Sequence, residues 1–152
     1  MGVPIALYEQ DFYAWLHAQI QLLKARQFEA IDLDHLIDEI ESLAAHEQLL
    51  VRHRLAQLLE HLYAWWWNLP ERSVRWQSVI ALQRDELADI LADSPSLREA
   101  LPDILTEVYA ELRKKWLHRD PHPHIPEVCP WTPGQLLDET FLPEGQTLMP
   151  QE

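Results

Sequence analysis

Cysteine, glycine and basic residues are scarce in this sequence, and each shortage excludes a class of protein. A single cysteine, Cys129, among 152 residues allows neither an internal disulfide nor a zinc site built on paired cysteines. Three glycines leave no glycine-rich loop of the kind that cradles phosphate, and no Gly-x-Ser-x-Gly elbow. The sequence therefore gives no specific support for a nucleotide-binding protein or a serine hydrolase.

The charge of the chain is strongly one-sided. Lysine and arginine number 12 against 25 aspartates and glutamates, which gives a formal net charge of −13 at pH 7. Binding to a phosphate backbone depends largely on Lys and Arg displacing counterions, so this composition disfavours nucleic acid. We therefore expect no nucleic-acid partner.

Long hydrophobic runs and targeting signals are missing as well. Charged or strongly polar residues interrupt every apolar stretch before the roughly 20 residues that span a bilayer. The segment from Met1 to Gln10 lacks a basic start, and Ala6 stands where a myristoylation signal needs Ser or Thr. These absences predict a cytoplasmic protein with no membrane association.

What the chain does have is enough apolar material for a folded body. Its hydrophobic share is 47%, it carries seven Trp, and 152 residues is the usual size of one domain. Five prolines between Pro121 and Pro133 set the C-terminal part apart. We expect a single domain over 1–152, with a helical body at about 7–118 and a Pro-rich tail at 119–152.

Apolar residues recur every three or four positions along most of the body, which is the spacing of one helical face. The pattern predicts a first helix over 7–26 and a long second helix from Asp32 or Asp34 to about residue 67. Neither Gly nor Pro occurs in 5–69, so the sequence offers no breaker inside the second helix.

Serine and proline mark the remaining helices of the body. Ser73 can cap a third helix that runs through about Ala92. A fourth helix begins after Pro95, and Pro102 should break it into a short turn and a main helix over 102–117.

The tail and the absence of strand patterns complete the expected fold. No segment alternates apolar and polar residues over the length of a strand. Thr132 and Pro133 predict one short helical turn at 132–138. The sequence therefore predicts an all-α fold, an antiparallel bundle of about four main helices with the Pro-rich tail packed on the outside.

Three polar residues fall on the apolar face of the second helix. Glu47, Arg54 and His61 follow one another at intervals of seven, so each lies about two turns from the next on the same side. Gln83 has a similar place on the apolar face of the third helix. A buried polar group without a partner costs roughly 1 to 3 kcal/mol, so we expect these four residues to find partners, including one another.

This polar set allows two interpretations. It could line a pocket inside the bundle that binds a small ligand or a metal ion, or that performs acid–base chemistry. Alternatively, it is an interior network that fixes the register of the helices. Two turns separate neighbouring members by about 10 Å, which is too far for Glu47 and His61 to share a metal ion unaided.

Histidines in the tail offer only a weak metal pattern. His118, His122 and His124 stand around Asp120, but their spacing matches no structural zinc motif. We expect neither a metal ion nor another cofactor, and we assign no catalytic residue.

Three consecutive tryptophans, Trp65 to Trp67, span about 200° of a helix and cannot share one face. Trp67 belongs to a second apolar stripe together with Leu49 and Tyr63. Another helix of the bundle can cover this stripe. If it stays open, Leu49, Tyr63, Trp66 and Trp67 form a surface for a protein partner or a second copy of the chain.

Several short motifs occur in a characteristic order along nearly the whole chain. They are Tyr8 with Asp11-Phe12-Tyr13-Ala14-Trp15, Asp38-Glu39-Ile40-Glu41-Ser42-Leu43, His61-Leu62 with Trp65, Gln83-Arg84, Pro95-Ser96-Leu97, Gln135-Leu136-Leu137-Asp138 and Phe141-Leu142-Pro143. The set resembles the bacterial domain of unknown function that carries the number twenty-nine. The resemblance implies a helical cytoplasmic protein for which no catalytic residues are established.

Taken together, the sequence favours an interaction or self-association module without catalytic activity, either with a protein partner or as a homodimer. The alternative is a ligand-binding or acid–base site lined by Glu47, Arg54, His61 and Gln83. A third interpretation is an acidic surface that engages a basic protein.

Overall fold

A computed structural model of the chain describes residues 6–67, 73–119 and 125–144. These ranges are helical with no strand and include four long helices, which confirms the predicted all-α class. The elements in chain order are α1 (Ala6–Gln10), α2 (Phe12–Lys24), the short 3-10 helix η1 (Phe28–Ala30), α3 (Leu33–Trp67), α4 (Val74–Asp93), α5 (Ser96–Arg119) and α6 (Pro133–Leu137).

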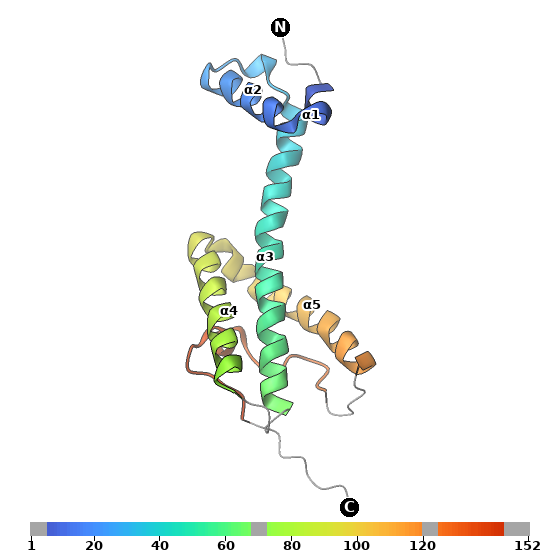
Figure 1. Ribbon diagram of the computed structural model, residues 1–152, viewed down its shortest axis with the longest axis vertical. Coiled ribbons are helices and arrows are strands. Elements are labelled where there is room, and N and C mark those ends of the chain that lie inside the picture. Colours follow the sequence, from blue (N-terminus) through green and yellow to red (C-terminus); the bar gives the residue numbers. More distant parts are fainter. Residues whose placement is uncertain (1–5, 68–72, 120–124, 145–152) are drawn as a thin grey trace, which may run out of the picture. The chain divides into compact units, whose positions relative to one another are not determined.

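The chain divides into two compact units, Met1–His46 and Glu47–Glu152, which we call unit 1 and unit 2. Unit 1 holds α1, α2, η1 and the first residues of α3, and unit 2 holds the remainder (Figure 1). The expectation of one domain over 1–152 stays a prediction.

Unit 1 contains two helices where the sequence predicted one over 7–26. The break falls at Asp11, whose Oδ1 accepts a hydrogen bond from the backbone N–H of Ala14 at 2.9 Å and so caps α2. The apolar spacing continues through the break, because Tyr8 of α1 is in ring contact with Phe12 and Trp15 of α2. Periodicity alone therefore could not reveal the change of direction.

The long helix α3 spans Leu33–Trp67, as the sequence predicted. Asp32 precedes it, and its backbone carbonyl accepts the N–H of Leu36 at 3.1 Å, as expected of the residue before a helix. From Val51 onward, one face of α3 is fully buried in the core of unit 2. The buried members of this face are Val51, Leu55, Leu58, Leu59, Leu62 and Trp65.

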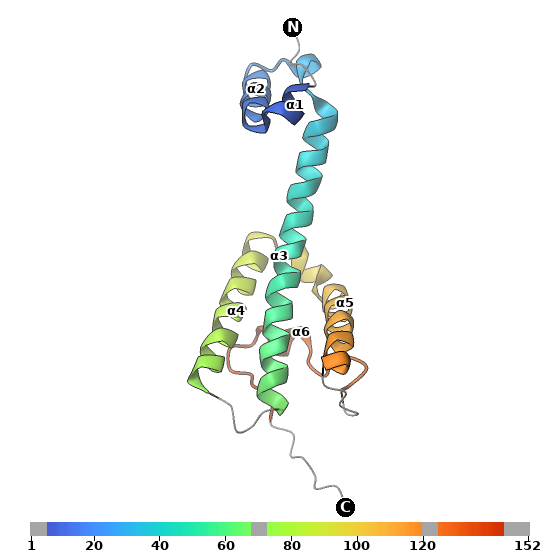
Figure 2. The same cartoon turned by 45° about the vertical axis from the view of Figure 1, so that its right-hand side comes forward.

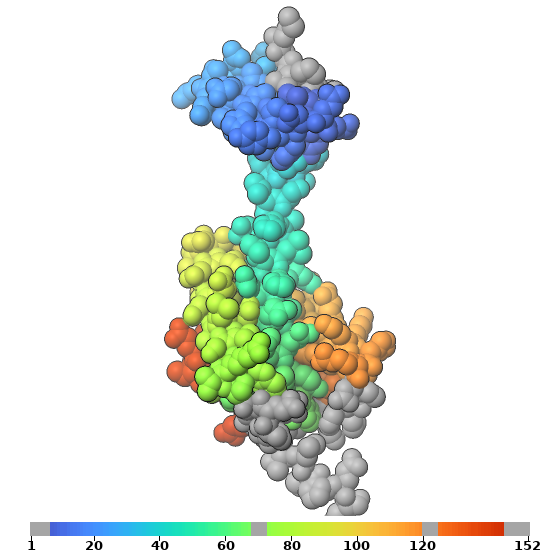
Figure 3. All heavy atoms as spheres, viewed as in Figure 1, coloured from blue at the N-terminus to red at the C-terminus, as the bar shows by residue number. Residues whose placement is uncertain are grey.

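Helix α4 runs beside the second half of α3 in the opposite direction (Figures 1 and 2). In the space-filling view, α4 and α5 lie on either side of this part of α3 (Figure 3). Ser73 caps α4 as predicted, because its Oγ accepts from the backbone N–H of Trp76 at 3.3 Å. Ile80, Leu87 and Leu91 of α4 are almost fully buried in the same core.

Helix α5 continues through Pro102, so the predicted break at that residue is wrong. Proline removes one helical hydrogen bond, leaving the carbonyl of Arg98, four residues earlier, without its usual donor. Arg98 is exposed, so water can satisfy that carbonyl. Leu101, Ile104 and Leu105 around the proline are buried, and their packing against the core offsets the lost bond.

The Pro-rich tail packs on the bundle and completes its core. Ile125, Trp131 and Leu136 are each less than 10% exposed. The predicted turn at 132–138 is confirmed as α6, which opens with a capping box between Thr132 and Gln135. The tail therefore holds three apolar anchors against the bundle.

Candidate functional site

The polar stripe of α3 is divided in the structure. Nη1 of Arg54 donates to Oε1 of Gln83 at 3.4 Å, and Nη2 lies 3.7 Å from Oε2 of Glu86 on the same helix α4. Nδ1 of His61 instead donates to the carbonyl oxygen of Gln57, one turn earlier in α3, at 2.7 Å. Of the four residues named from the sequence, the structure joins Arg54 with Gln83.

Glu47 departs from its expected place, because its side chain is exposed. The buried face of α3 begins one turn later, at Val51. The apolar spacing of α3 therefore extends beyond the part of the helix that the core buries. His61 is half-buried and lines a shallow hollow of about 220 Å³ together with Trp76 and Arg119. Glu47 does not line this hollow.

The second apolar stripe is largely covered by other parts of unit 2. The ring of Tyr63 stacks on Trp116 of α5, with centroids 4.1 Å apart and planes at 8°. Trp66 meets Trp131 of the tail edge-on at 5.6 Å, and it also contacts Trp67 at 5.1 Å. These rings are part of the packing that joins α3, α5 and the tail. Of the proposed surface residues, Leu49 is the one classed as exposed.

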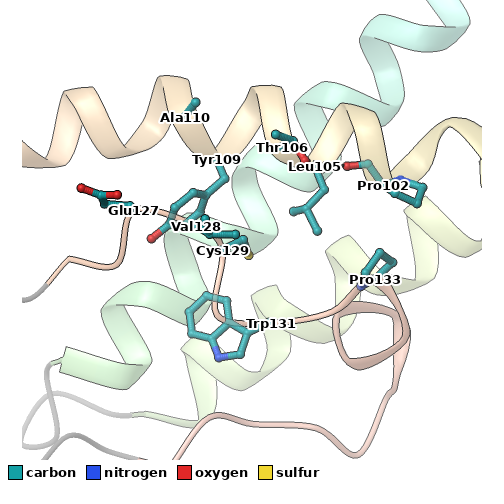
Figure 4. A pocket seen from close by; sticks show the side chains of 10 residues that line it. All are labelled: Pro102, Leu105, Thr106, Tyr109, Ala110, Glu127, Val128, Cys129, Trp131 and Pro133. Carbon is teal, nitrogen blue, oxygen red and sulfur yellow. Dashed lines mark hydrogen bonds between the residues drawn. The ribbon is translucent and has the colours of Figure 1, made fainter.

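An apolar groove of about 290 Å³ lies between α5 and the tail of unit 2 (Figure 4). Leu105 and Tyr109 project from α5 toward the tail, and Trp131 and Cys129 lie across from them. The remaining lining residues are Pro102, Thr106, Ala110, Glu127, Val128 and Pro133. Such a lining offers apolar contact and few hydrogen-bonding groups.

Two polar groups of this groove, the Tyr109 hydroxyl and the Cys129 thiol, have little capacity for binding or catalysis. The hydroxyl of Tyr109 donates to the carbonyl oxygen of Pro126 at 2.7 Å, and Nε of Arg113 donates to the same oxygen at 2.9 Å. Burial raises the pKa of Tyr109 to about 12. Burial also raises the pKa of the Cys129 thiol, so it stays protonated and is a poor nucleophile.

Unit 1 holds a compact set of hydrogen bonds centred on Asp32. Its Oδ2 accepts from Nε1 of Trp15 at 3.0 Å and lies 2.7 Å from Nδ1 of His35. The backbone N–H of Asp32 donates to Oε1 of the buried Gln19 at 2.8 Å. Burial favours a raised pKa for Asp32, but the hydrogen bonds from His35 and Trp15 outweigh it and hold the pKa below the usual 3.8.

Tyr8 extends this set to the next turn of α3. Its ring stacks on His35 with centroids 3.8 Å apart, and its hydroxyl donates to Oε1 of Glu39. The hydrogen bond to Glu39 raises the pKa of Tyr8, and burial and neighbouring carboxylates add to that effect. We call Tyr8, Trp15, Gln19, Asp32, His35 and Glu39 the Asp32 cluster.

Sequence reasoning did not single out the Asp32 cluster. Tyr8, Trp15 and Glu39 entered only as parts of a family pattern, and Asp32 only as a helix cap. The spacing of three between Asp32 and His35 was the one local signal, since a cap residue and the third residue of a helix are neighbours. The contacts with Trp15 and Gln19 depend on how α2 folds back, which no spacing reports.

Unit 1 exposes much of its apolar surface. Among the residues that the structure describes, nine of the thirteen exposed large hydrophobic side chains lie in unit 1, although this unit has 46 of the 152 residues. Trp15 is the one buried large apolar side chain among its described residues. Four of the nine follow one face of α3, namely Leu33, Ile37, Ile40 and Leu43, with exposed fractions of 56%, 43%, 64% and 66%. We call these four residues the α3 face.

The described ranges hold neither a metal-binding cluster nor a membrane-spanning helix. In the ranges 6–67, 73–119 and 125–144, no group of three or more His, Cys, Asp or Glu side chains could hold a metal ion. His122 and His124 lie outside those ranges. No helix in the described part of the chain combines the length and hydropathy needed to cross a bilayer.

Comparison with known proteins places the chain in a family. Residues 7–142 match the family described as Domain of unknown function DUF29. The match covers most of the chain, so the protein belongs to this family, as the ordered motifs indicated. No curated protein and no solved structure matches the chain.

Proposed function

We propose that the protein is an interaction module that binds a protein partner through the α3 face of unit 1. The observation that carries this proposal is the exposure of four aliphatic side chains on successive turns of one helix. Burying a Leu or Ile side chain is worth about 1.5 to 3 kcal/mol, so four of them on one face supply a substantial driving force for association. Contiguous apolar surface of this kind commonly marks a binding site.

The Asp32 cluster supports the proposal by fixing the start of α3. Asp32 ties the beginning of α3 to Trp15 of α2, and Tyr8 of α1 contacts both His35 and Glu39. The α3 face begins next to these contacts. A partner therefore meets a helix that is already held in place, which reduces the entropy lost on binding.

The test is a single charge placed in the middle of the α3 face. Ile40→Asp should abolish the recovery of a specific partner from a native extract, while Leu82→Asp should leave it unchanged. Leu82 is a matched control, because it is 52% exposed on α4 in unit 2. Circular dichroism should show that both variants keep the helix content of the parent. Equal recovery with Ile40→Asp and the parent would refute the proposal.

A second candidate function is small-ligand binding at Arg54 and Gln83. One observation favours it: Nε of Arg54 is buried with no hydrogen-bond partner among the described residues. A polar ligand or an ordered water could accept that hydrogen bond. Gln83→Leu should reduce ligand-induced stabilisation in a thermal-shift screen of metabolites, and Gln77→Leu, an exposed position on α4, should not. If Gln83→Leu changes only the melting temperature without ligand, the site is structural.

A further inference from the structure

We infer that the partner of the α3 face is a basic amphipathic helix, with an apolar stripe flanked by Lys and Arg. This inference rests on the proposed function and specifies the class of its partner. It follows from the charges that surround the α3 face, which are independent of the apolar exposure itself. Amphipathic helices commonly bind through apolar residues spaced three and four positions apart.

The segment around the α3 face carries one sign of charge. No Lys or Arg occurs between Arg26 and Arg52, whereas 27–46 contains six Asp and Glu residues. The two cations of unit 1, Lys24 and Arg26, lie at the end of α2. A partner that docks on the α3 face therefore meets a field of negative charge.

Two of these acidic residues line an edge of the α3 face. At about 100° per residue, Asp34 and Glu41 project on the same side of the helix, and Ile37 of the α3 face lies three residues from Asp34 and four from Glu41. Both carboxylates are exposed. The helix dipole accounts for Asp34 in the first turn, but Glu41 lies beyond its reach. The position of Glu41 therefore has another explanation, and we take it to be a charge that attracts a cationic partner to the α3 face.

A second copy of the chain is the competing occupant, and charge disfavours it. Two α3 faces packed on each other would bring their acidic edges together with no Lys or Arg of the same segment to neutralise them. Like charges brought together in an interface disfavour association. A helix with Lys or Arg beside its apolar stripe would instead pair with Asp34 and Glu41 while its Leu side chains cover Ile37 and Ile40.

The probe is a pair of synthetic amphipathic helices of about 18 residues, with the same Leu stripe and with either Lys or Glu at the remaining positions. Each carries a fluorophore, and fluorescence anisotropy measures its binding to the full chain. We expect the Leu/Lys peptide to bind at least tenfold more tightly than the Leu/Glu peptide. Ile40→Asp should weaken the Leu/Lys peptide at least tenfold, because it places a charge under the Leu stripe.

A charge-reversal pair separates docking on the α3 face from attraction to an acidic protein in general. Asp34→Lys with Glu41→Lys should shift the preference toward the Leu/Glu peptide. Asp85→Lys with Asp89→Lys changes the net charge by the same amount at two exposed positions on α4. This control variant should keep the preference for the Leu/Lys peptide.

Two results would reject the basic helix as the partner without rejecting the proposed interaction function, and a third would reject both. If both double variants lose the Leu/Lys peptide equally, binding is non-specific and the inference is wrong. If light scattering shows a dimer of the parent that Ile40→Asp converts to a monomer, a second copy occupies the α3 face. The proposed interaction function then stands while the basic-helix partner is rejected. If Ile40→Asp affects neither peptide binding, partner recovery nor mass, both proposals fail.

Discussion

Nε of Arg84 donates a 2.8 Å hydrogen bond to the carbonyl oxygen of Leu136, and this bond links α4 to α6 across 52 residues of sequence. Arg84 is 3% exposed, and its Nη2 has no partner among the described residues. Burial lowers the pKa of its guanidinium, and the charges of Asp138 and Glu139 partly oppose that effect. A buried cation thus holds the tail through a backbone carbonyl.

Replacing this cation should loosen the tail. Arg84→Ala removes the bond to Leu136 and leaves a cavity, so we expect a loss of about 1.5 to 3 kcal/mol in the free energy of unfolding. Chemical denaturation measures that loss, and limited proteolysis should cut the 125–144 segment faster. Arg98→Ala is the control, since Arg98 is exposed on α5. It should change stability by less than about 0.5 kcal/mol.

The Asp32 cluster predicts a pH-dependent stability. Asp32→Asn weakens the hydrogen bonds from Trp15 and His35, and at about 1 kcal/mol each we expect a loss of about 1 to 2 kcal/mol at pH 7. The pKa of Asp32 is lower in the folded state than its usual 3.8. Its contribution is therefore fully present above the unfolded pKa and is lost as pH falls through the folded pKa. The difference between parent and variant should shrink below about pH 4 in urea titrations.

Asp38→Asn provides the matched control for this experiment. Asp38 is exposed on α3, and its replacement makes the same change of net charge. The control should show little loss of stability at pH 7. Equal effects of the two substitutions would mean that net charge, and not the hydrogen bonds of Asp32, controls the stability of unit 1.

The second apolar stripe of α3 gives a clear contrast between core and surface. Trp66 packs against Trp131, so Trp66→Ala should destabilise unit 2 by about 2 to 4 kcal/mol, given its partial burial. Leu49 is 58% exposed, and Leu49→Ala should be nearly neutral in the same thermal denaturation. If Trp66→Ala leaves stability intact and instead prevents association, this stripe is an interface after all.

Tyr109 should make unit 2 sensitive to alkali. Its pKa is about 12 in the folded chain against 10.0 ordinarily, because burial disfavours the phenolate. The unfolded chain therefore loses this proton first, and stability should fall as pH rises from about 10 toward 12. Tyr109→Phe should flatten the fall, whereas Tyr13→Phe, at a residue 72% exposed, should not. Stability measured in urea between pH 8 and 11 compares the three chains.

The main helices could be predicted because their signals are local. Ser73 at the start of α4, and Thr132 with Gln135 at α6, report caps that form within four residues. The break at Asp11 was missed because the apolar spacing runs through it. The break expected at Pro102 does not occur, since the burial of its neighbours outweighs one lost hydrogen bond.

The candidate site was harder to predict, because burial depends on tertiary contacts. Glu47 and Arg54 have equivalent positions on one stripe, yet Glu47 is exposed while Arg54 reaches Gln83. The sequence shows that one stripe of α3 is apolar, but it does not show over what length another helix covers that stripe. The exposure of the α3 face could not be predicted for the same reason, since its apolar spacing continues without a break into the buried residues from Val51 onward.

The contacts of unit 1 also determine when it can form. The hydrogen bonds and ring contacts of the Asp32 cluster join residues at most 31 positions apart. The hydrogen bond from Arg84, in contrast, can form only after Leu136 has been synthesised. Short loops close early, and during translation the N-terminal part of a chain folds first. We expect unit 1 to be complete on the ribosome while the tail is still unsynthesised. Its aliphatic side chains would then be exposed while the tail that completes the core of unit 2 is still missing.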